Sequence, residues 1–164
     1  YLEVLLREIS QIRNEEKNRK PIMLKIDPDN TNDHYSIILN LVNKYNIDGI
    51  IATNTSLSRP EILQDLNKKR QGGLSGTPIK DISDKVLKFL YQETNNELIL
   101  IGVGGVGSAS DVYSKIKLGA SLVQMYTSLT YGGPQLINKI LIDLVKLIKD
   151  DGFANISEAV GVNN

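Results

Sequence analysis

The chain alternates short apolar, β-branched runs with amphipathic helical patterns, and this alternation restricts the fold more than any other feature of the sequence. Strand–helix repeats of this kind are typical of α/β proteins built on a parallel sheet. Apolar residues recur at the 3.6-residue period of a helix, most clearly after Pro134. The predicted helices cover residues 2–9, 35–45, 82–90, 109–118 and 134–148. The predicted strands cover residues 22–26, 49–53, 98–103 and 121–126.

Length, charge and cysteine content narrow the function classes. The 164 residues suit one domain, and 19 Lys plus Arg balance 19 Asp plus Glu, so no nucleic acid is expected as a partner. The absence of cysteine excludes a disulfide framework and cysteine metal sites within this sequence. No apolar run approaches the ~18 residues of a membrane span, and no targeting signal is recognised in this segment.

A lysine interrupts the first predicted strand. Because side chains alternate between the two faces of a strand, Leu24 and Ile26 are predicted to face the helices. Lys25 then points to the other side, with Met23 and Asp27. A charged amine there is costly unless it meets an anion, so Lys25 is a candidate for binding an anionic ligand. The alternative is a structural lysine that reaches solvent or pairs with Asp27 or another carboxylate.

The second predicted strand runs into the polar residues Thr53, Asn54 and Thr55. Parallel α/β sheets bind ligands at the carboxyl ends of their strands. Hydroxyl and amide groups form hydrogen bonds without titrating near neutrality, which favours the orientation of a carboxylate or amide substrate over proton transfer. A polar strand exit that caps local backbone is the other interpretation, and these residues alone do not separate the two.

Two clusters of glycine, at residues 72–76 and 102–108, indicate places where the backbone comes close to a ligand. The second cluster follows a predicted strand and precedes a short helix, so its N–H groups are suited to bind a phosphate. Gly102, Gly104 and Gly107 match the spacing G-x-G-x-x-G of dinucleotide-binding folds, but no acidic residue ends the next strand. The phosphate site of a β/α barrel fits this pattern better.

The remaining polar clusters are predicted to be structural. His34 is the only histidine, so this sequence offers neither a Ser-His-Asp arrangement nor a multi-histidine site, and no metal is predicted. Residues 27–33 lack the glycine and glutamate of a calcium loop, and we expect turn and helix-cap roles there. Residues 13–20 are predicted to be a solvated helix end and loop. The connection at 56–78 has a length that usually indicates function.

Five short motifs stand in one order along nearly the whole chain. They are MLKIDPD at 23–29, ATNT at 52–55, GGLSG at 72–76, IGVGGV at 101–106 and GASLVQMYT at 119–127. Together they resemble the second half of a dihydroorotate dehydrogenase. The tail, at 152–161, is similar to the end of the class 2, quinone-dependent branch of that family. Each motif is weak alone, whereas the five in family order are specific.

This resemblance implies a (β/α)8 TIM barrel that holds FMN at the carboxyl ends of its strands. Residues 1–164 would be the C-terminal half of this FMN-binding domain, roughly strands five to eight. Lys25 matches the strand lysine of the family, whose cation stabilises the anion formed on flavin reduction. Asp27 stands where the family commonly has a small apolar residue such as alanine, and its carboxylate is placed to compete for the Lys25 ammonium.

The resemblance also assigns the other site positions. Asn54 and Thr55 would bind orotate. Gly76, Gly105 and Tyr126 match positions whose backbone holds the FMN phosphate and ribityl chain. The complete cofactor-binding set implied is Lys25, Thr53, Ser75, Gly76, Gly104, Gly105, Tyr126 and Thr127.

The implied activity is the oxidation of dihydroorotate to orotate in pyrimidine (UMP) biosynthesis. Dihydroorotate would lose a proton to a serine base and a hydride to FMN, and electrons would then pass to a quinone. The serine base, the first flavin-binding asparagines and the quinone tunnel are expected upstream of Tyr1. This segment alone therefore has no assigned catalytic base and is expected to be inactive. The full protein would be peripheral on the bacterial cytoplasmic membrane or the mitochondrial inner membrane.

Other functions fit parts of the same pattern. A class 1 dihydroorotate dehydrogenase, linked to fumarate or NAD, or another FMN-barrel oxidoreductase would share most of these residues. A phosphate-ligand barrel lyase or isomerase, with Lys25 as a Schiff-base or phosphate lysine, is a more distant alternative. The glycine cluster at 72–76 argues against it, because that cluster has no evident task without a flavin ribityl chain.

Overall fold

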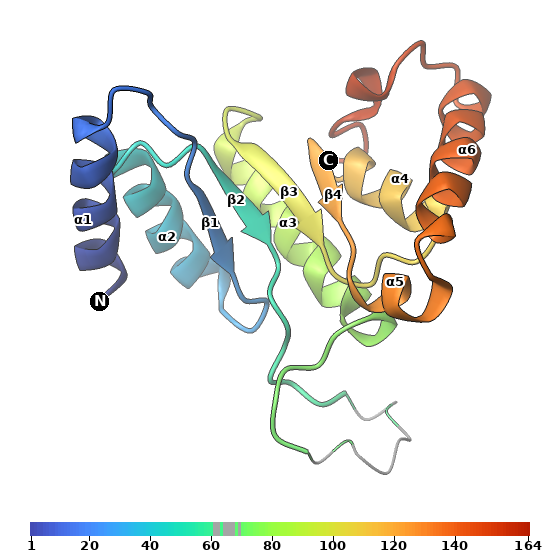
Figure 1. Cartoon of the computed structure of the whole chain (residues 1–164), viewed down its shortest axis with the longest axis horizontal. Coiled ribbons are helices and arrows are strands. Elements are labelled where there is room, and N and C mark those ends of the chain that lie inside the picture. Colours follow the sequence, from blue (N-terminus) through green and yellow to red (C-terminus); the bar gives the residue numbers. More distant parts are fainter. Residues whose placement is uncertain (61–62, 64–67, 69) are drawn as a thin grey trace.

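The computed structural model describes residues 1–60, 63, 68 and 70–164. Its centre is one sheet of parallel strands that follow chain order, β1-β2-β3-β4 (Figure 1). Each of the first three strands is followed by a crossover to the next strand, as the sequence pattern predicts for a parallel α/β sheet. The strands are β1 (Met23–Ile26), β2 (Gly49–Ala52), β3 (Ile99–Val103) and β4 (Leu122–Gln124).

Helices cover one face of this sheet. In Figure 1, α3 lies behind β2 and β3, α2 lies on the left beside β1, and α4 lies on the right between β4 and α6, against which it packs. No helix in the described ranges is both long and apolar enough to cross a membrane. The helices are α1 (Leu2–Glu15), α2 (Asn32–Lys44), α3 (Lys80–Thr94), α4 (Ala109–Lys117), α5 (Thr127–Gly132) and α6 (Gln135–Asp150), with 3-10 turns at Thr77–Ile79 and Ile156–Ala159.

The core lies between the sheet and these helices. Ile50 and Leu100 are paired in register and fully buried, and they pack with Leu87 of α3. Residues of opposite parity point to the other face, where Ile99 is 47% exposed and Leu122 is 59% exposed. The sheet therefore has one well-packed face and one open apolar face.

The fourth strand is shorter than predicted. It ends at Gln124 instead of residue 126, and the unpredicted helix α5 begins at Thr127. The reason is the backbone of Tyr126, whose carbonyl accepts hydrogen bonds from the N–H groups of Leu129 (3.0 Å) and Thr130 (3.3 Å). Tyr126, which looks like the end of a strand, is therefore the residue that caps the start of α5.

Arg13 contradicts the prediction of a solvated helix end. Its side chain is only 5% exposed, and its guanidinium donates to the carbonyls of Asn46 (2.8 Å) and Tyr45 (3.2 Å) and to Asp48 (3.2 Å). Asp48 also forms an ion pair with Arg19 and accepts from the Ile22 N–H (2.7 Å). Despite partial burial, which acts in the opposite direction, these hydrogen bonds and cations lower the pKa of Asp48. Arg13 thus joins α1 to the turn between α2 and β2.

Candidate functional site

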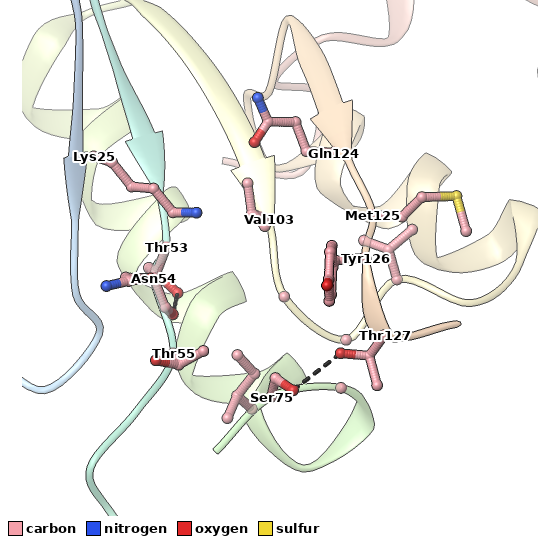
Figure 2. Close-up of a pocket in the computed structure, with 15 residues that line it drawn as sticks. Lys25, Thr53, Asn54, Thr55, Ser75, Val103, Gln124, Met125, Tyr126 and Thr127 are labelled. Atoms are coloured by element: carbon pink, nitrogen blue, oxygen red, sulfur yellow. Dashed lines mark hydrogen bonds between the residues drawn. The ribbon is translucent and has the colours of Figure 1, made fainter. Parts of the chain in front are cut away.

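A cleft of about 420 Å³ opens at the carboxyl ends of the strands, and all ten site residues predicted from the sequence line it (Figure 2). The parallel strands bring these residues together because each strand ends at the same edge of the sheet. Predicted and observed lining residues are Lys25, Thr53, Asn54, Thr55, Ser75, Gly76, Gly104, Gly105, Tyr126 and Thr127. Five further lining residues have no role predicted from the sequence, namely Ile79, Val103, Val106, Gln124 and Met125.

Lys25 supplies a cation to this cleft. Its side chain is exposed on the open face of β1, on the side opposite to the buried Ile26, as strand alternation predicts. Figure 2 shows the ammonium pointing into the cleft. The expected competition from Asp27 does not occur, because that carboxylate accepts hydrogen bonds from Asn30 Nδ2 (3.0 Å) and the Asp29 N–H (3.1 Å) within the turn after β1. The Lys25 ammonium is therefore available to a ligand.

The segment that follows β2 has a hydrogen-bonded backbone and exposes two of its three polar side chains. The Thr53 N–H donates to the Val103 carbonyl (3.0 Å), and the Asn54 N–H donates to the Ile26 carbonyl (2.6 Å). Thr53 is 1% exposed, and its hydroxyl donates to the Asn54 carbonyl (3.0 Å). Asn54 and Thr55 are exposed, and in the described part of the chain their side chains have no hydrogen-bond partner. These two side chains are thus positioned to bind a ligand.

Asp29 holds the chain just beyond this segment. Its carboxylate accepts from Ser56 Oγ (2.5 Å), the Leu57 N–H (2.6 Å) and Ser58 Oγ (3.2 Å). Burial acts in the opposite direction, but these hydrogen bonds lower the pKa of Asp29. The expected turn and cap roles around it are also seen, since Thr31 Oγ1 caps α2 by accepting from the His34 N–H (3.4 Å). Asp29 was missed as a support of the site because its partners lie 27 or more residues away.

The long connection returns to the cleft beside Thr55. Backbone hydrogen bonds join Ser56 and Leu74 in both directions, at 3.0 and 2.7 Å. Gly73 lies against the Thr55 side chain so closely that a Cβ at residue 73 would be 1.8 Å from Thr55 Oγ1. The first glycine cluster therefore packs on the polar segment after β2 and brings Ser75 into the cleft. The predicted functional connection at 56–78 lies partly outside the described residues, at 61–62, 64–67 and 69.

Hydrogen-bond donors collect at the other side of the cleft. Thr127 Oγ1 donates to Ser75 Oγ (3.0 Å), which joins the start of α5 to the first glycine cluster (Figure 2). Among the described residues, the N–H groups of Gly76, Gly104 and Gly105 form no hydrogen bond with the protein. Free N–H groups and hydroxyls of this kind suit a phosphate.

The structure gives Gly105 a second task. Its φ is +71°, and a Cβ at this position would lie 2.4 Å from Lys80 Cβ and 2.7 Å from Lys80 Cα. The side-chain position of Gly105 is thus filled by α3. The sequence explains this glycine only by a close approach to a ligand, and the structure adds that the loop needs it to pack on α3.

Among the described residues, no three or more His, Asp or Glu side chains form a group that could hold a metal ion. His34 lies exposed at the start of α2, and it does not line the cleft.

Comparison with protein families decides the assignment. The family model described as dihydroorotate dehydrogenase matches residues 3–148. The chain belongs to the dihydroorotate dehydrogenase family. A quinone-dependent dihydroorotate dehydrogenase of Trichodesmium erythraeum is 44% identical over 170 residues, and the mitochondrial quinone-dependent enzyme of Mus musculus is 40% identical over 162 residues. The alignments cover 99% and 98% of this chain, but only 43% and 41% of the respective relatives.

Solved dihydroorotate dehydrogenases share the fold. The ligand-free enzyme of Eimeria tenella superposes with a TM-score of 0.94 at 30% identity, and the same enzyme with ferulenol superposes with a TM-score of 0.93 at 29% identity. Each alignment covers 99% of this chain and about half of the other chain, 49% and 48%. Because the family folds as TIM barrels, the predicted barrel class is confirmed, and the four parallel strands are part of such a barrel.

Proposed function

We propose that residues 1–164 are the C-terminal half of an FMN-binding TIM barrel and supply its strands five to eight. The complete protein then oxidises dihydroorotate to orotate in pyrimidine biosynthesis and passes the electrons to a quinone. The observation that carries this proposal is the cleft itself. It combines one cation, a pair of free polar side chains and a set of free N–H groups, in the family order of motifs.

The cleft fits FMN in its donor chemistry. The Lys25 ammonium suits the end of a flavin ring that gains negative charge, and the free N–H groups of Gly76, Gly104 and Gly105 suit its phosphate. Figure 2 places Lys25 and Thr127 on different sides of the cleft, so that a long ligand can contact both. When bound, FMN supplies the hydride acceptor.

The residues of the cleft bind the flavin and the substrate and orient them relative to each other. Thr53 and Lys25 contact the flavin, and the Ser75–Thr127 pair closes the phosphate side with help from Tyr126. Asn54 and Thr55 hydrogen-bond the ring and carboxylate of orotate or dihydroorotate. We assign the proton acceptor to a serine outside residues 1–164, in the other half of the barrel.

The proposals of a quinone acceptor and of membrane association rest on the relatives. The relatives from Trichodesmium erythraeum and Mus musculus are both named as quinone-dependent, and the mouse protein is named as mitochondrial. We assign the same acceptor class to the complete protein, together with peripheral association with a bacterial cytoplasmic or mitochondrial inner membrane. The quinone site would belong to the part of the protein outside residues 1–164.

A spectrum and an acceptor assay test this function. The purified full-length protein is expected to show flavin absorbance, to release FMN on denaturation and to reduce a soluble ubiquinone analogue with dihydroorotate. Reduction of fumarate or NAD instead would indicate a class 1 enzyme. A protein without flavin would support the lyase or isomerase alternative and contradict the proposal.

Replacing Asn54 by alanine is expected to separate substrate binding from cofactor binding. The loss of a partner for a polar group of bound orotate costs about 1–3 kcal/mol, whereas FMN stays bound. Titration of the flavoprotein with orotate measures the first effect, and flavin absorbance per protein measures the second. Asn40→Ala, at an exposed position on α2, is the control. Loss of flavin with unchanged orotate affinity would show that the two assignments are exchanged.

Replacing Gly105 by alanine is expected to release most of the flavin from the full-length protein. The added Cβ meets Lys80 of α3 at 2.4 Å, so the loop must shift away from α3 and its N–H groups leave their positions in the cleft. Gly152→Ala is a matched control, because Gly152 also has a positive φ (+83°), but a Cβ added there would have no atom within 4 Å, and Gly152 does not line the cleft. Flavin content after desalting is the measurement, and equal retention by both variants would contradict the role of Gly105.

A further inference from the structure

An ionic cluster around the buried Lys115 lies behind the cleft, on the helix-facing side of the sheet. Lys115 of α4 is 0% exposed, and its ammonium donates to Asp84 Oδ1 (2.7 Å) and Ser83 Oγ (2.9 Å) of α3. Burial lowers the pKa of Lys115, while the Asp84 carboxylate acts in the opposite direction. A Cβ at Gly102 would lie 2.9 Å from Lys115 Cδ, so the first glycine of the second cluster makes room for this lysine.

The ionic cluster consists of Lys115, Asp84, Lys80 and Asp111. Together with Ser83, it contacts the chain at both ends of the loop formed by residues 104–106. At the first end, Ser83 Oγ donates to the carbonyl of Val103, the residue immediately before the loop. At the second end, the Gly107 N–H donates to Asp111 Oδ2 (3.1 Å). The loop itself lines the cleft with N–H groups that form no hydrogen bond with any residue the structure describes.

Asp84 connects these two attachments. One of its oxygens contacts Lys115, and the other lies 3.5 Å from Lys80 Nζ, which is also 3.5 Å from Asp111 Oδ1. Two lysines and two aspartates give the cluster a formal charge of zero, and neither Lys115 nor Asp84 lines the cleft. Its effect on an anionic ligand must therefore act through the position of the loop.

We propose that Lys115, Asp84 and Ser83 form a positioning device that holds the loop at 104–106 in its phosphate-binding conformation. The inference deepens the proposed function and rests on it. A loop held at both ends presents its N–H groups without the entropic cost of ordering them at binding. The device should therefore strengthen binding of the phosphate more than binding of the flavin ring.

The ratio of riboflavin to FMN affinity tests this proposal, because riboflavin lacks only the phosphate. Apoprotein of the full-length enzyme is titrated with each flavin by fluorescence quenching. Ser83→Ala removes the bond to the Val103 carbonyl, and Lys115→Met removes the buried cation. Each variant is expected to weaken FMN binding about tenfold more than riboflavin binding. If Lys115→Met does not fold, Ser83→Ala, which keeps the Lys115–Asp84 pair, carries the same test.

Arg13→Met is the matched control, because Arg13 is also a buried cation paired with an aspartate, but it joins α1 to the turn between α2 and β2 and does not line the cleft. It should lower the melting temperature and leave the affinity ratio unchanged. Equal loss of FMN and riboflavin affinity in the Ser83 and Lys115 variants would overturn the positioning role. A wild-type protein that binds neither flavin would instead overturn the proposed function, and this inference with it.

Discussion

Replacing Lys25 by alanine in the full-length protein is expected to slow dihydroorotate oxidation by at least ~100-fold. The reason is electrostatic, since a preorganised cation lowers the barrier most where negative charge develops during the reaction. Lys25 is suited to this role because its ammonium points into the cleft and Asp27 is engaged elsewhere. The same variant should also retain less FMN. Stopped-flow mixing with dihydroorotate, followed at the flavin absorbance maximum, measures the rate.

Lys20→Ala provides the comparison for this variant. Lys20 is exposed before β1 and does not line the cleft, so its removal should leave both the rate and the flavin content unchanged. Normal kinetics with full flavin content in the Lys25 variant would show that the cation has no part in the reaction. Lys25→Arg keeps the charge with a different shape, and partial recovery of the rate would support an electrostatic role.

Residues 1–164 expressed alone are expected to be aggregated, dimeric or molten, to bind no FMN tightly and to show no dihydroorotate oxidation. Within the described chain, β1 and β4 are the edges of the sheet, and unpaired edges promote association between chains. The open face of the sheet exposes Ile99 and Leu122, which in a closed barrel would contact side chains from the opposing strands. The proposed serine base lies outside this segment.

Size-exclusion chromatography with simultaneous protein and flavin absorbance tests this expectation. Co-expression with the remaining half of the barrel is the informative control, because it should restore a soluble, flavin-containing complex if the missing contacts are the cause. A compact monomer of residues 1–164 that carries one flavin and oxidises dihydroorotate would contradict both the half-barrel interpretation and the absence of a base.

The class of fold could be predicted because helices and strands that are buried on one side have apolar residues at regular intervals in the sequence. Ile50 and Leu100 stand in short β-branched runs, and both are fully buried against helices with a 3.6-residue pattern. The convergence of Lys25, Asn54 and Thr127 could also be predicted, since parallel strands end at one edge of the sheet. Their assignment to flavin, orotate and phosphate came from the resemblance and stays a prediction.

The supports of the site could not be predicted in the same way. Arg13 and Asp48 are 35 residues apart, Asp29 and Ser56 are 27 apart, and Lys115 and Asp84 are 31 apart. A charged residue carries no local sign of its partner, because the pairing depends on how whole helices and strands pack. The start of α5 was missed for a related reason, since its first turn depends on where the backbone goes after β4.

Periodicity was therefore enough for the parallel α/β architecture, and the order of the motifs, through the family resemblance, was enough for ten of the fifteen residues that line the cleft. The tertiary packing alone placed Lys115 beneath Gly102. It also filled the side-chain position of Gly105 with α3. These features depend on distances between elements far apart in sequence, which no local pattern encodes.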